Sequence, residues 1–525
     1  MAQTSSPRRL RWWPAALIVA LLAAALIYIW NIAQLPSDQH RVMNTALSIV
    51  VSSILLLLWW VFFSGLRAWT RLRGLLVVVG LYLLCWGLFR YDGVSGNLVP
   101  QLTWRWSERD LVSERASDAI SDFTVGTYDF PQFLGPDRDG RLPARGLLAD
   151  WEAHPPRLLW KQDIGAGWAG FAIVDGVAVT LEQRQDQETV VAYDLDTGKV
   201  FWTHGDPVSF ENPVAGAGPR STPTLHEGRV YTLGATGLLN CLNFESGELL
   251  WQRDIEDLFD KASSQQYGRA ASPLIVDDLV VVNPGGEGSA LAAFDKVTGQ
   301  LRWSKGTATP AYASPVLATL AGQRQILNYN YATLAGHDPR DGSVLWQTEL
   351  EGRSPRCAQP LVVSENLVLT SAGYGLGSEM FQVRREESGK WQVERAYRTI
   401  RLKSKFADMI YFDDFIYGLD DGILTCIDPG DGSRRWKGGR YGHGQLLLVG
   451  DLLLITTEGG DVVLIDPKPS RLIELARFQA LDGAKVWNPP ALAGNILLVR
   501  DHRQAAAFEL PMSEELAEEE QPGGN

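Results

Sequence analysis

Eight side chains in the last two-thirds of the chain combine positive charge with aromatic rings, in a protein whose formal net charge is −13. Four are permanently basic, two carry an indole, and the others are a tyrosine and a histidine. Gathered in one concave site, they would concentrate positive potential beside flat apolar walls and would suit an anionic, partly planar ligand or an acidic peptide segment. The candidates are Trp168, Arg220, Arg269, Tyr312, Arg356, Lys405, His443 and Trp487.

A sequence repeat is what would bring these distant residues together. A small residue, an Asp or Asn, a Gly and a Trp recur in five copies, and the Asp or Asn precedes the Trp by eight positions in each. Self-similarity at a period of roughly 40 to 50 residues is the signature of a repeat architecture. The five Asp/Asn and Trp pairs are Asp194 and Trp202, Asn243 and Trp251, Asp295 and Trp303, Asp338 and Trp346, and Asp428 and Trp436.

Each repeat has the pattern of a four-stranded antiparallel sheet. An apolar inner strand starts at a Ser-Pro or Thr-Pro step, for example Thr222-Pro223, and a hairpin turn leads into a β-branched second strand. The third strand ends at the Asp or Asn, a turn containing Gly reverses the chain, and the outer strand carries the Trp. Residues just before each inner strand then share one rim of a central channel. We call this rim the mouth, and the eight candidates are expected to lie on it.

Two degenerate copies extend the count of sheets. In the copy around Gly389 the Trp is displaced by two residues, to Trp391. In the copy that contains Asp466, Glu474 stands where the Trp is expected. With these copies the repeat predicts eight sheets, which are the blades of a β-propeller.

The last copy stops at Glu509 and has no outer strand, whereas a strand at residues 157–161 has no sheet of its own. A strand from the amino-terminal side that completes the last sheet would close the ring and remove exposed sheet edges. The sequence therefore predicts an all-β, circularly closed, eight-bladed β-propeller at residues 129–510.

Three apolar runs occupy the first 90 residues, at 12–32, 46–65 and 74–89. The first two have the ~20 residues needed to cross a bilayer, and the third is shorter. A cleaved signal peptide is the rival interpretation of the first run. No small-x-small cleavage site follows it and two more runs come next, so three retained transmembrane α-helices are favoured.

The distribution of Lys and Arg predicts the orientation of these helices. The first and third flanking segments carry three Arg residues each, whereas the loop at 33–45 has only Arg41. Basic segments face the cytoplasm, so everything after residue 89 is expected outside it. The predicted location is the bacterial inner (cytoplasmic) membrane, with the propeller on the periplasmic side. The basic residues are Arg8, Arg9 and Arg11, and Arg67, Arg71 and Arg73.

The predicted domains are a membrane anchor at 1–90, a linker at 91–128, the propeller at 129–510 and a disordered acidic tail at 511–525. The negative net charge argues against a nucleic-acid partner. Four cysteines without a CxxC motif give no framework of disulfides, and Cys241 and Cys426 occupy the small-residue position of the repeat. The seven histidines have no zinc-ligand spacing, so no metal site is predicted.

The opening segment, residues 130–140, reads Phe-Pro-Gln-Phe-Leu-Gly-Pro-Asp-Arg-Asp-Gly. Together with the repeat, it resembles the pyrroloquinoline-quinone (PQQ) propeller family. PQQ-dependent alcohol and glucose dehydrogenases share that repeat with the lipoprotein of the outer-membrane β-barrel assembly machinery. The resemblance covers about 380 residues. It is specific for the fold and weak for the activity, because one repeat serves both enzymes and scaffolds.

The resemblance leaves two functions open. In the enzyme branch, the eight mouth residues would bind PQQ, a planar tricarboxylate, with Ca²⁺ held by oxygen ligands such as Glu182, Asn488 and Asp408. No spacing selects these ligands or a general base, and the adjacent cysteine pair typical of quinoprotein alcohol dehydrogenases is absent. The preferred interpretation is a non-catalytic binding or scaffold propeller with a protein partner in the cell envelope. The alternative is a membrane-bound PQQ-dependent oxidoreductase acting on alcohols or sugars.

Overall fold

The computed structural model describes residues 10–33, 35, 38–106, 120, 123–143, 146–259, 265–483 and 485–513. The chain divides into two compact units, Met1–Arg109 with Pro213–Gly216, and Asp110–Asn212 with Ala217–Asn525. The predicted acidic tail from residue 514 onward lies outside the described residues, as does most of 107–122 in the predicted linker.

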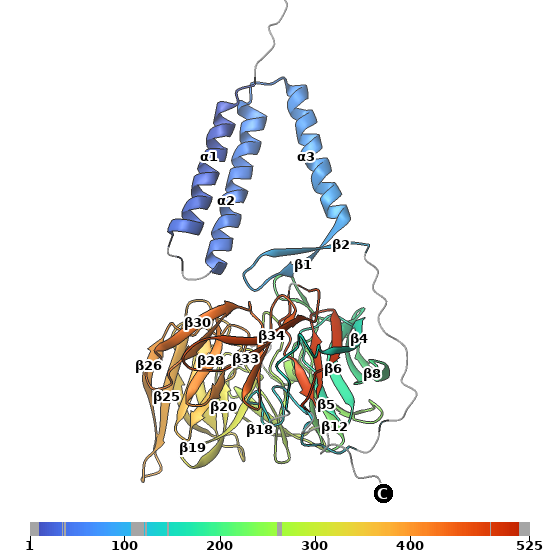
Figure 1. Ribbon diagram of the computed structural model, residues 1–525, viewed down its shortest axis with the longest axis vertical. Coiled ribbons are helices and arrows are strands. Elements are labelled where there is room, and N and C mark those ends of the chain that lie inside the picture. Colours follow the sequence, from blue (N-terminus) through green and yellow to red (C-terminus); the bar gives the residue numbers. More distant parts are fainter. Residues whose placement is uncertain are drawn as a thin grey trace, which may run out of the picture. The chain divides into compact units, whose positions relative to one another are not determined.

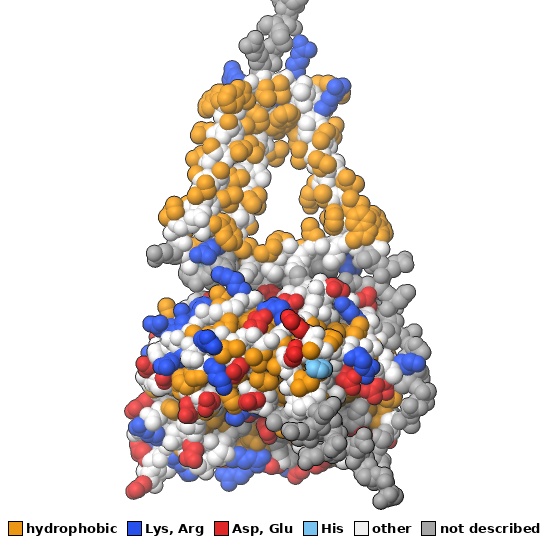
Figure 2. Space-filling view, viewed as in Figure 1, with side chains coloured by type: hydrophobic (Ala, Val, Ile, Leu, Met, Phe, Trp, Pro, Cys, Tyr) orange, Lys and Arg blue, Asp and Glu red, His pale blue; other side chains and the backbone are white. Residues whose placement is uncertain are grey.

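The first unit contains three long helical segments (Figure 1). The first two each end in a π-helical turn, and all three are long and apolar enough to cross a membrane, with 20, 25 and 21 residues. Hydrophobic side chains cover their sides (Figure 2). The segments are α1 (Trp13–Ile27) with η1 (Tyr28–Ile32), α2 (Asp38–Leu58) with η2 (Trp59–Phe63), and α3 (Ala68–Leu88).

Three apolar helices are therefore confirmed, but the second and third begin earlier than their apolar runs. Polar residues before each run extend the helix by several positions. An antiparallel hairpin of β1 (Phe89–Val94) and β2 (Pro100–Trp104) follows α3. The hairpin lies largely within the predicted linker at 91–128, and it could not be predicted because two short strands with little alternation give a weak signal.

The second unit is all-β and consists of consecutive antiparallel sheets (Figure 1). Eight sheets of four or more strands occur in the described part of the chain, and we number them in sequence order. The first four sheets are β5 (Ala172–Val174), β6 (Val177–Arg184), β7 (Gln187–Asp194) and β8 (Val200–Asp206); β11 (Thr224–His226), β12 (Arg229–Leu233), β13 (Leu238–Asn243) and β14 (Leu249–Asp254); β15 (Leu274–Val276), β16 (Leu279–Val282), β17 (Leu291–Asp295) and β18 (Leu301–Lys305); and β19 (Val316–Leu320), β20 (Gln323–Tyr329), β21 (Thr333–His337) and β22 (Val344–Glu349).

The other four sheets follow the same order, with one strand added to the seventh. They are β23 (Leu361–Ser364), β24 (Leu367–Ala372), β25 (Gly377–Arg385) and β26 (Trp391–Thr399); β27 (Ile410–Phe412), β28 (Phe415–Asp420), β29 (Ile423–Ile427) and β30 (Arg434–Arg440); β31 (Gln445–Val449), β32 (Leu452–Thr456), β33 (Asp461–Asp466) and β34 (Ile473–Gln479), joined by β3 (Arg141–Leu142); and β35 (Ala491–Ala493), β36 (Ile496–Arg500), β37 (Gln504–Glu509) and β4 (Arg157–Asp163). The connections contain β9 (Glu211–Asn212), β10 (Gly216–Ala217) and α4 (Ile255–Leu258).

The repeated Trp and Gly residues pack one sheet on the next. In the second sheet Trp251 pairs across the strands with the small Cys241, and a β-bulge follows. An added Cβ on Gly299, in the turn of the third sheet, would lie 2.6 Å from the Trp251 ring, so only Gly leaves room for it. The indole Nε1 donates to Lys296 O of that turn at 3.1 Å. Trp160, Trp202 and Trp303 make the same contact with Gly198, Gly247 and Gly342.

The two degenerate copies differ from the sequence prediction. In the fifth sheet Tyr397, not Trp391, lies opposite the small-residue position at Met380 and packs against Gly432. In the seventh sheet Ala476, not Glu474, lies opposite Leu464. Both outer strands start later relative to the turn than in the regular copies, so the eight-residue spacing fails there.

A row of hydrogen bonds joins the starts of neighbouring inner strands. Gly170 N donates to Thr222 Oγ1 at 3.0 Å, Thr222 N to Ser272 Oγ at 2.9 Å, and Ser272 N to Ser314 Oγ at 2.9 Å. The Ser or Thr side chain thus gives the backbone N–H of the preceding sheet a buried acceptor. This requirement explains the Ser-Pro and Thr-Pro steps of the sequence.

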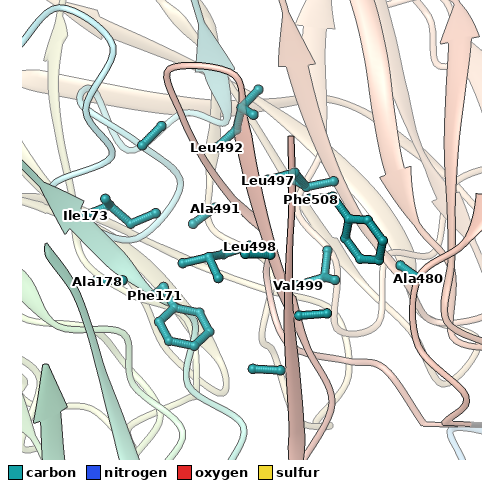
Figure 3. Close-up of a cluster of buried hydrophobic side chains, with 14 of the residues drawn as sticks. Phe171, Ile173, Ala178, Ala480, Ala491, Leu492, Leu497, Leu498, Val499 and Phe508 are labelled. Carbon is teal, nitrogen blue, oxygen red and sulfur yellow. The ribbon is translucent and has the colours of Figure 1, made fainter. Parts of the chain in front are cut away.

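The last sheet is completed from the amino-terminal side. β4 pairs antiparallel with β37, with Trp160 opposite Ala507, as the sequence predicts. The last sheet then packs against the first. Figure 3 shows Leu498 and Val499 of β36 in the same buried cluster as Phe171 and Ile173 of the first sheet.

Candidate functional site

Each of the eight predicted mouth residues lies two to five positions before an inner strand. The connections between sheets therefore carry them, close to the start of each inner strand. Trp168, Trp487 and His443 are joined through Phe406 into one continuous set of ring contacts. That all eight bind a ligand stays a prediction.

An aromatic cluster is formed by residues of the sixth, seventh, eighth and first sheets. The rings of Trp168 and Trp487 lie 5.0 Å apart and are tilted by 34°. Phe406 contacts Trp487 at 4.7 Å and His443 at 5.6 Å. His502 stacks on Trp168 at 5.3 Å with an interplanar angle of 12°. Trp168 is only 7% exposed, so its ring offers little surface to a stacking ligand.

Two lysines contact these rings through their ammonium groups. Lys485 Nζ lies 4.7 Å from the ring centres of both Trp168 and Trp487. Lys405 Nζ lies 4.8 Å from Tyr374 and 5.2 Å from Phe406. Burial lowers the pKa of Lys405 to about 8, against the opposing effect of nearby carboxylates and the Cys357 thiol. Such cation–π contacts hold a buried positive charge at the mouth.

A carboxylate supports the same cluster from beneath. Glu458 Oε1 accepts from Trp487 Nε1 at 2.9 Å, and Oε2 accepts from the backbone N of His443 at 3.0 Å. Because Glu458 lies near Lys405 as well, this side of the mouth has fixed ring positions and partly balanced charge.

Arg269 and Arg356 serve the fold rather than facing outward. Arg269 bonds to Glu256 Oε1 through Nε at 2.8 Å and Nη2 at 2.6 Å, and Nη1 donates to Pro284 O. Arg356 is 1% exposed and donates to Tyr331 O, Tyr329 Oη and Glu351 O at 2.7 to 2.9 Å. The donors of both guanidiniums are thus engaged inside the protein, which sequence reasoning did not reveal.

Arg220 and Tyr312 belong to the other side of the mouth. The Arg220 guanidinium lies 4.6 Å from the Phe210 ring, and burial lowers its pKa to about 10. Tyr312 lies 5.8 Å from Tyr267, and burial raises its pKa. Cys357, beside Arg356, is a half-buried thiol, and desolvation raises its pKa to about 12, so it is a poor nucleophile at neutral pH.

Sequence reasoning missed most of the aromatic residues at the mouth. Tyr331 and Tyr374 lie in hairpin turns that open to the same rim, and both interact electrostatically with Tyr267 and Cys357. Lys485, Tyr267 and Phe406 lie one or two positions from a predicted mouth residue. Two signals in the sequence could have located these residues. Some lie beside a predicted mouth residue, and the others lie in the hairpin turns that open to the same rim.

The three suggested metal ligands have structural partners. Glu182 is fully buried and accepts from Gly165 N at 2.7 Å and Tyr193 Oη at 2.6 Å. Asn488 Nδ2 donates to Ala169 O at 2.8 Å. Asp408 lies deeper in the channel, where Oδ1 accepts from Gln359 N and burial raises its pKa to about 7.

PQQ with a calcium ion does not fit this set of donors. Two of the four basic candidates are unavailable to its carboxylates, because Arg269 and Arg356 are engaged by Glu256 and by backbone carbonyls. A calcium site needs several converging oxygen ligands. Within the described residues, no three His, Cys, Asp or Glu side chains are placed to hold a metal ion.

Comparison with known proteins agrees with the repeat. Residues 186–438 match the PQQ_2 family model, described as outer membrane protein assembly factor BamB. An outer membrane protein assembly factor BamB of Moranella endobia (strain PCIT) is 21% identical over 267 residues, 47% of this chain and 64% of that protein. The chain thus spans less than two-thirds of that curated relative.

Two solved structures are similar at low sequence identity. A europium-containing methanol dehydrogenase has a TM-score of 0.56 and 10% identity, over 73% of this chain and 98% of that one. BamB from Moraxella catarrhalis has a TM-score of 0.49 and 16% identity, over 68% and 100% of the two chains. The former likeness concerns the fold alone. With its repeated Gly and Trp contacts and its four-stranded sheets, the chain resembles PQQ-like repeat proteins over residues 186–438, and it carries three apolar amino-terminal helices.

Proposed function

We propose that this protein is a membrane-anchored propeller that binds a partner protein and acts as a scaffold in the bacterial cell envelope. Residues 1–90 form the anchor, 91–128 the linker, 129–510 a closed eight-bladed propeller and 511–525 an acidic tail. The anchor crosses the inner membrane and leaves the propeller on the periplasmic side.

Contacts between inner strands support a closed ring of eight blades. β5 lies beside β11, β11 beside β15, β15 beside β19, β23 beside β27, and β27 beside β31. β35 of the last sheet lies beside β5 of the first. A ring in which each sheet packs on its neighbours, with β4 completing the last, leaves only short protected edges.

Half-buried aromatic rings at the mouth are the observation that carries the binding proposal. Aromatic side chains are enriched at protein interfaces, and half-buried rings in a fixed arrangement bury area at a low cost in side-chain entropy. The residues are Phe210, Tyr267, Tyr312, Tyr331, Tyr374, Phe406 and Trp487.

The charges beneath the rings favour an acidic segment of the partner. Arg220, Lys405 and Lys485 hold positive charge against aromatic faces within the rim. A carboxylate that enters the rim would be attracted to these charges while its neighbours pack on the rings. The curated relative is, by its name, an assembly factor for outer membrane proteins, and a protein-binding role here is in keeping with that name.

Site-specific photocrosslinking in intact membranes tests the proposal. Benzoylphenylalanine is placed at Tyr374 and, in a second variant, at Phe406. The control position is Val297, an exposed residue in the turn between β17 and β18. We expect a discrete crosslinked protein from both mouth positions and none from Val297. Crosslinks of equal yield at all three positions, or at none, would overturn the proposal.

Titration of the full-length protein separates this function from the alternative, a PQQ-dependent alcohol or sugar oxidoreductase. We expect no binding heat from PQQ with Ca²⁺, because the arginine donors are already engaged. Micromolar binding that is lost in Arg220→Ala would favour the oxidoreductase instead.

A further inference from the structure

A pocket lies apart from the eight mouth residues, none of which lines it. It has a volume of about 300 Å³ and is bounded by the opening segment and by the inner strands β19, β23 and β27. Its walls combine inner-strand residues with the opening segment, which pairs with β31 through β3. The volume is at the lower end of the range for small-molecule sites.

Arg138 of the opening segment reaches into the channel and is 4% exposed. Its Nη1 donates to Pro273 O at 2.9 Å, and Nη2 donates to Ser272 O at 3.2 Å. These bonds fix the guanidinium against the starts of inner strands. Nε has no hydrogen-bond partner among the described residues, although it is buried and its side chain lines the pocket.

Gln359 and Asp408 present the complementary acceptors. Gln359 Nε2 donates to Arg138 O at 2.9 Å, but its buried Oε1 has no partner in the described part of the chain. Asp408 Oδ1 accepts from Gln359 N. Both side chains are more than nine-tenths buried. One buried donor, Arg138 Nε, and one buried acceptor, Gln359 Oε1, are thus left without a partner among the described residues, which is costly unless something bonds to them. Asp408 adds a second carboxylate oxygen to the lining of the pocket.

The other walls of the pocket are largely apolar, and its charges nearly balance. Val316, Leu361, Met409 and Tyr411 line its sides. Acidic Asp137, Asp139 and Asp408 oppose basic Arg138 and Arg141. Near balance of charge favours a neutral ligand over a strong anion or cation.

We propose that this pocket binds a neutral hydroxylated ring, such as a monosaccharide or a cyclic polyol. A hydroxyl accepts from Arg138 Nε and donates to Gln359 Oε1, and a second hydroxyl donates to Asp408 Oδ2. The C–H faces of the ring pack on the aliphatic walls. The site is separate from the aromatic mouth and does not depend on the scaffold proposal.

Saturation-transfer NMR on the full-length protein in lipid nanodiscs tests the site, with D-glucose and myo-inositol as probes and acetate as the anionic control. Thr319→Trp adds a large ring to the lining of the pocket at an exposed position and changes none of Arg138, Gln359 and Asp408. Thr203→Trp is the matched control, an exposed threonine on β8 of another sheet. Asp408→Asn keeps an oxygen that accepts from Gln359 N and replaces the other carboxylate oxygen, Oδ2, by an NH₂ group.

We expect saturation transfer to the ring protons of at least one probe and none to acetate. The saturation-transfer signal is lost in Thr319→Trp and kept in Thr203→Trp. In Asp408→Asn the affinity for the probe falls roughly tenfold. Absence of transfer to both probes would mean that only water fills the pocket, and would overturn the proposal. Transfer that persists in Thr319→Trp would place binding elsewhere and would overturn it equally.

Discussion

Arg356 illustrates, at the scale of the residue, how the fold can use a mouth arginine internally. Its guanidinium donates to the backbone carbonyls of Tyr331, Glu351 and Gly352 and to Tyr329 Oη. A basic residue at a channel rim is therefore not by itself a ligand site. Whether such a residue is available to a ligand depends on its hydrogen-bond partners inside the protein.

Replacing Arg356 by Ala should lower the free energy of unfolding by about 3 kcal/mol, because several buried acceptors lose their donor. Arg353→Ala, an exposed neighbour, should change it by less than about 0.5 kcal/mol. Urea unfolding followed by tryptophan fluorescence measures both. Equal stability of the two variants would contradict the structural role of Arg356.

Asp408 makes stability depend on pH. Burial raises its pKa from 3.8 to about 7 in the folded protein, so the folded state holds this proton more tightly than the unfolded chain does. The stability it contributes is fully present below pH 3.8 and is lost as pH rises to about 7. Arg138 and Cys357 interact with this carboxyl.

Asp408→Asn should remove this part of the pH dependence while keeping the oxygen that accepts from Gln359 N. The melting temperature of the variant relative to the wild type should therefore rise between pH 4 and pH 7. Thermal unfolding across that range measures the difference. A constant difference would show that Asp408 has an ordinary pKa.

The place of each candidate residue shortly before an inner strand could be predicted, but its partners could not. Distance from the inner strand depends only on the repeat, so sequence spacing locates Trp168 or Lys405. The partners of Arg269 and Arg356 come from α4 and from loop carbonyls, whose conformations the repeat does not specify. The unpaired atoms of Arg138 and Gln359 likewise depend on where the opening segment crosses the channel.

At the scale of the element, the repeat encodes contacts between neighbouring sheets. The Asp of each turn accepts from backbone N–H groups, as Asp194 Oδ1 does from Thr197 N at 2.7 Å, and the Gly leaves room for the preceding Trp. Inner strands and outer Trp positions were predictable because both lie in regular copies. Tyr397 and Ala476 were not, because their turns differ in length from the regular ones.

Gly247→Ala tests the contact between sheets. Gly247 has a φ of +71°, and a Cβ there would lie 2.4 Å from the Trp202 ring, so we expect a loss of about 3 kcal/mol. Gly176→Ala is the matched control, because its φ is +72° but no atom lies within 4 Å of the added Cβ. It should cost about 1 kcal/mol, the backbone term alone. If both variants lose the same free energy of unfolding in urea, the contact with Trp202 is not the reason for glycine at position 247.

At the scale of the whole molecule, the distribution of Lys and Arg around the three apolar helices predicts an orientation in the membrane. Short basic segments flank the first and third helices, while the intervening loop has few positive charges. Length and composition identify the helices from sequence, whereas no apolar pattern predicts the β1–β2 hairpin that follows them.

Alkaline phosphatase fusions test the orientation. A fusion after Trp106, beyond the third helix, should be active because the enzyme folds only outside the cytoplasm. A fusion after Leu66, in the basic second loop, should be inactive. Activity in the reverse pattern would place the propeller in the cytoplasm and end the envelope proposal.

The pairing of β4 with β37 also sets an order for folding. Arg157 Nε donates to Glu509 Oε2 at 2.7 Å across a sequence separation of 352 residues, whereas the middle sheets form from adjacent hairpins. Contacts of such separation form late, because the whole intervening chain must be made and placed first. Until residue 509 is synthesised, β4 has no partner and open strand edges can pair with other chains. Aggregation of this protein should therefore be a hazard of its synthesis far more than of its finished state.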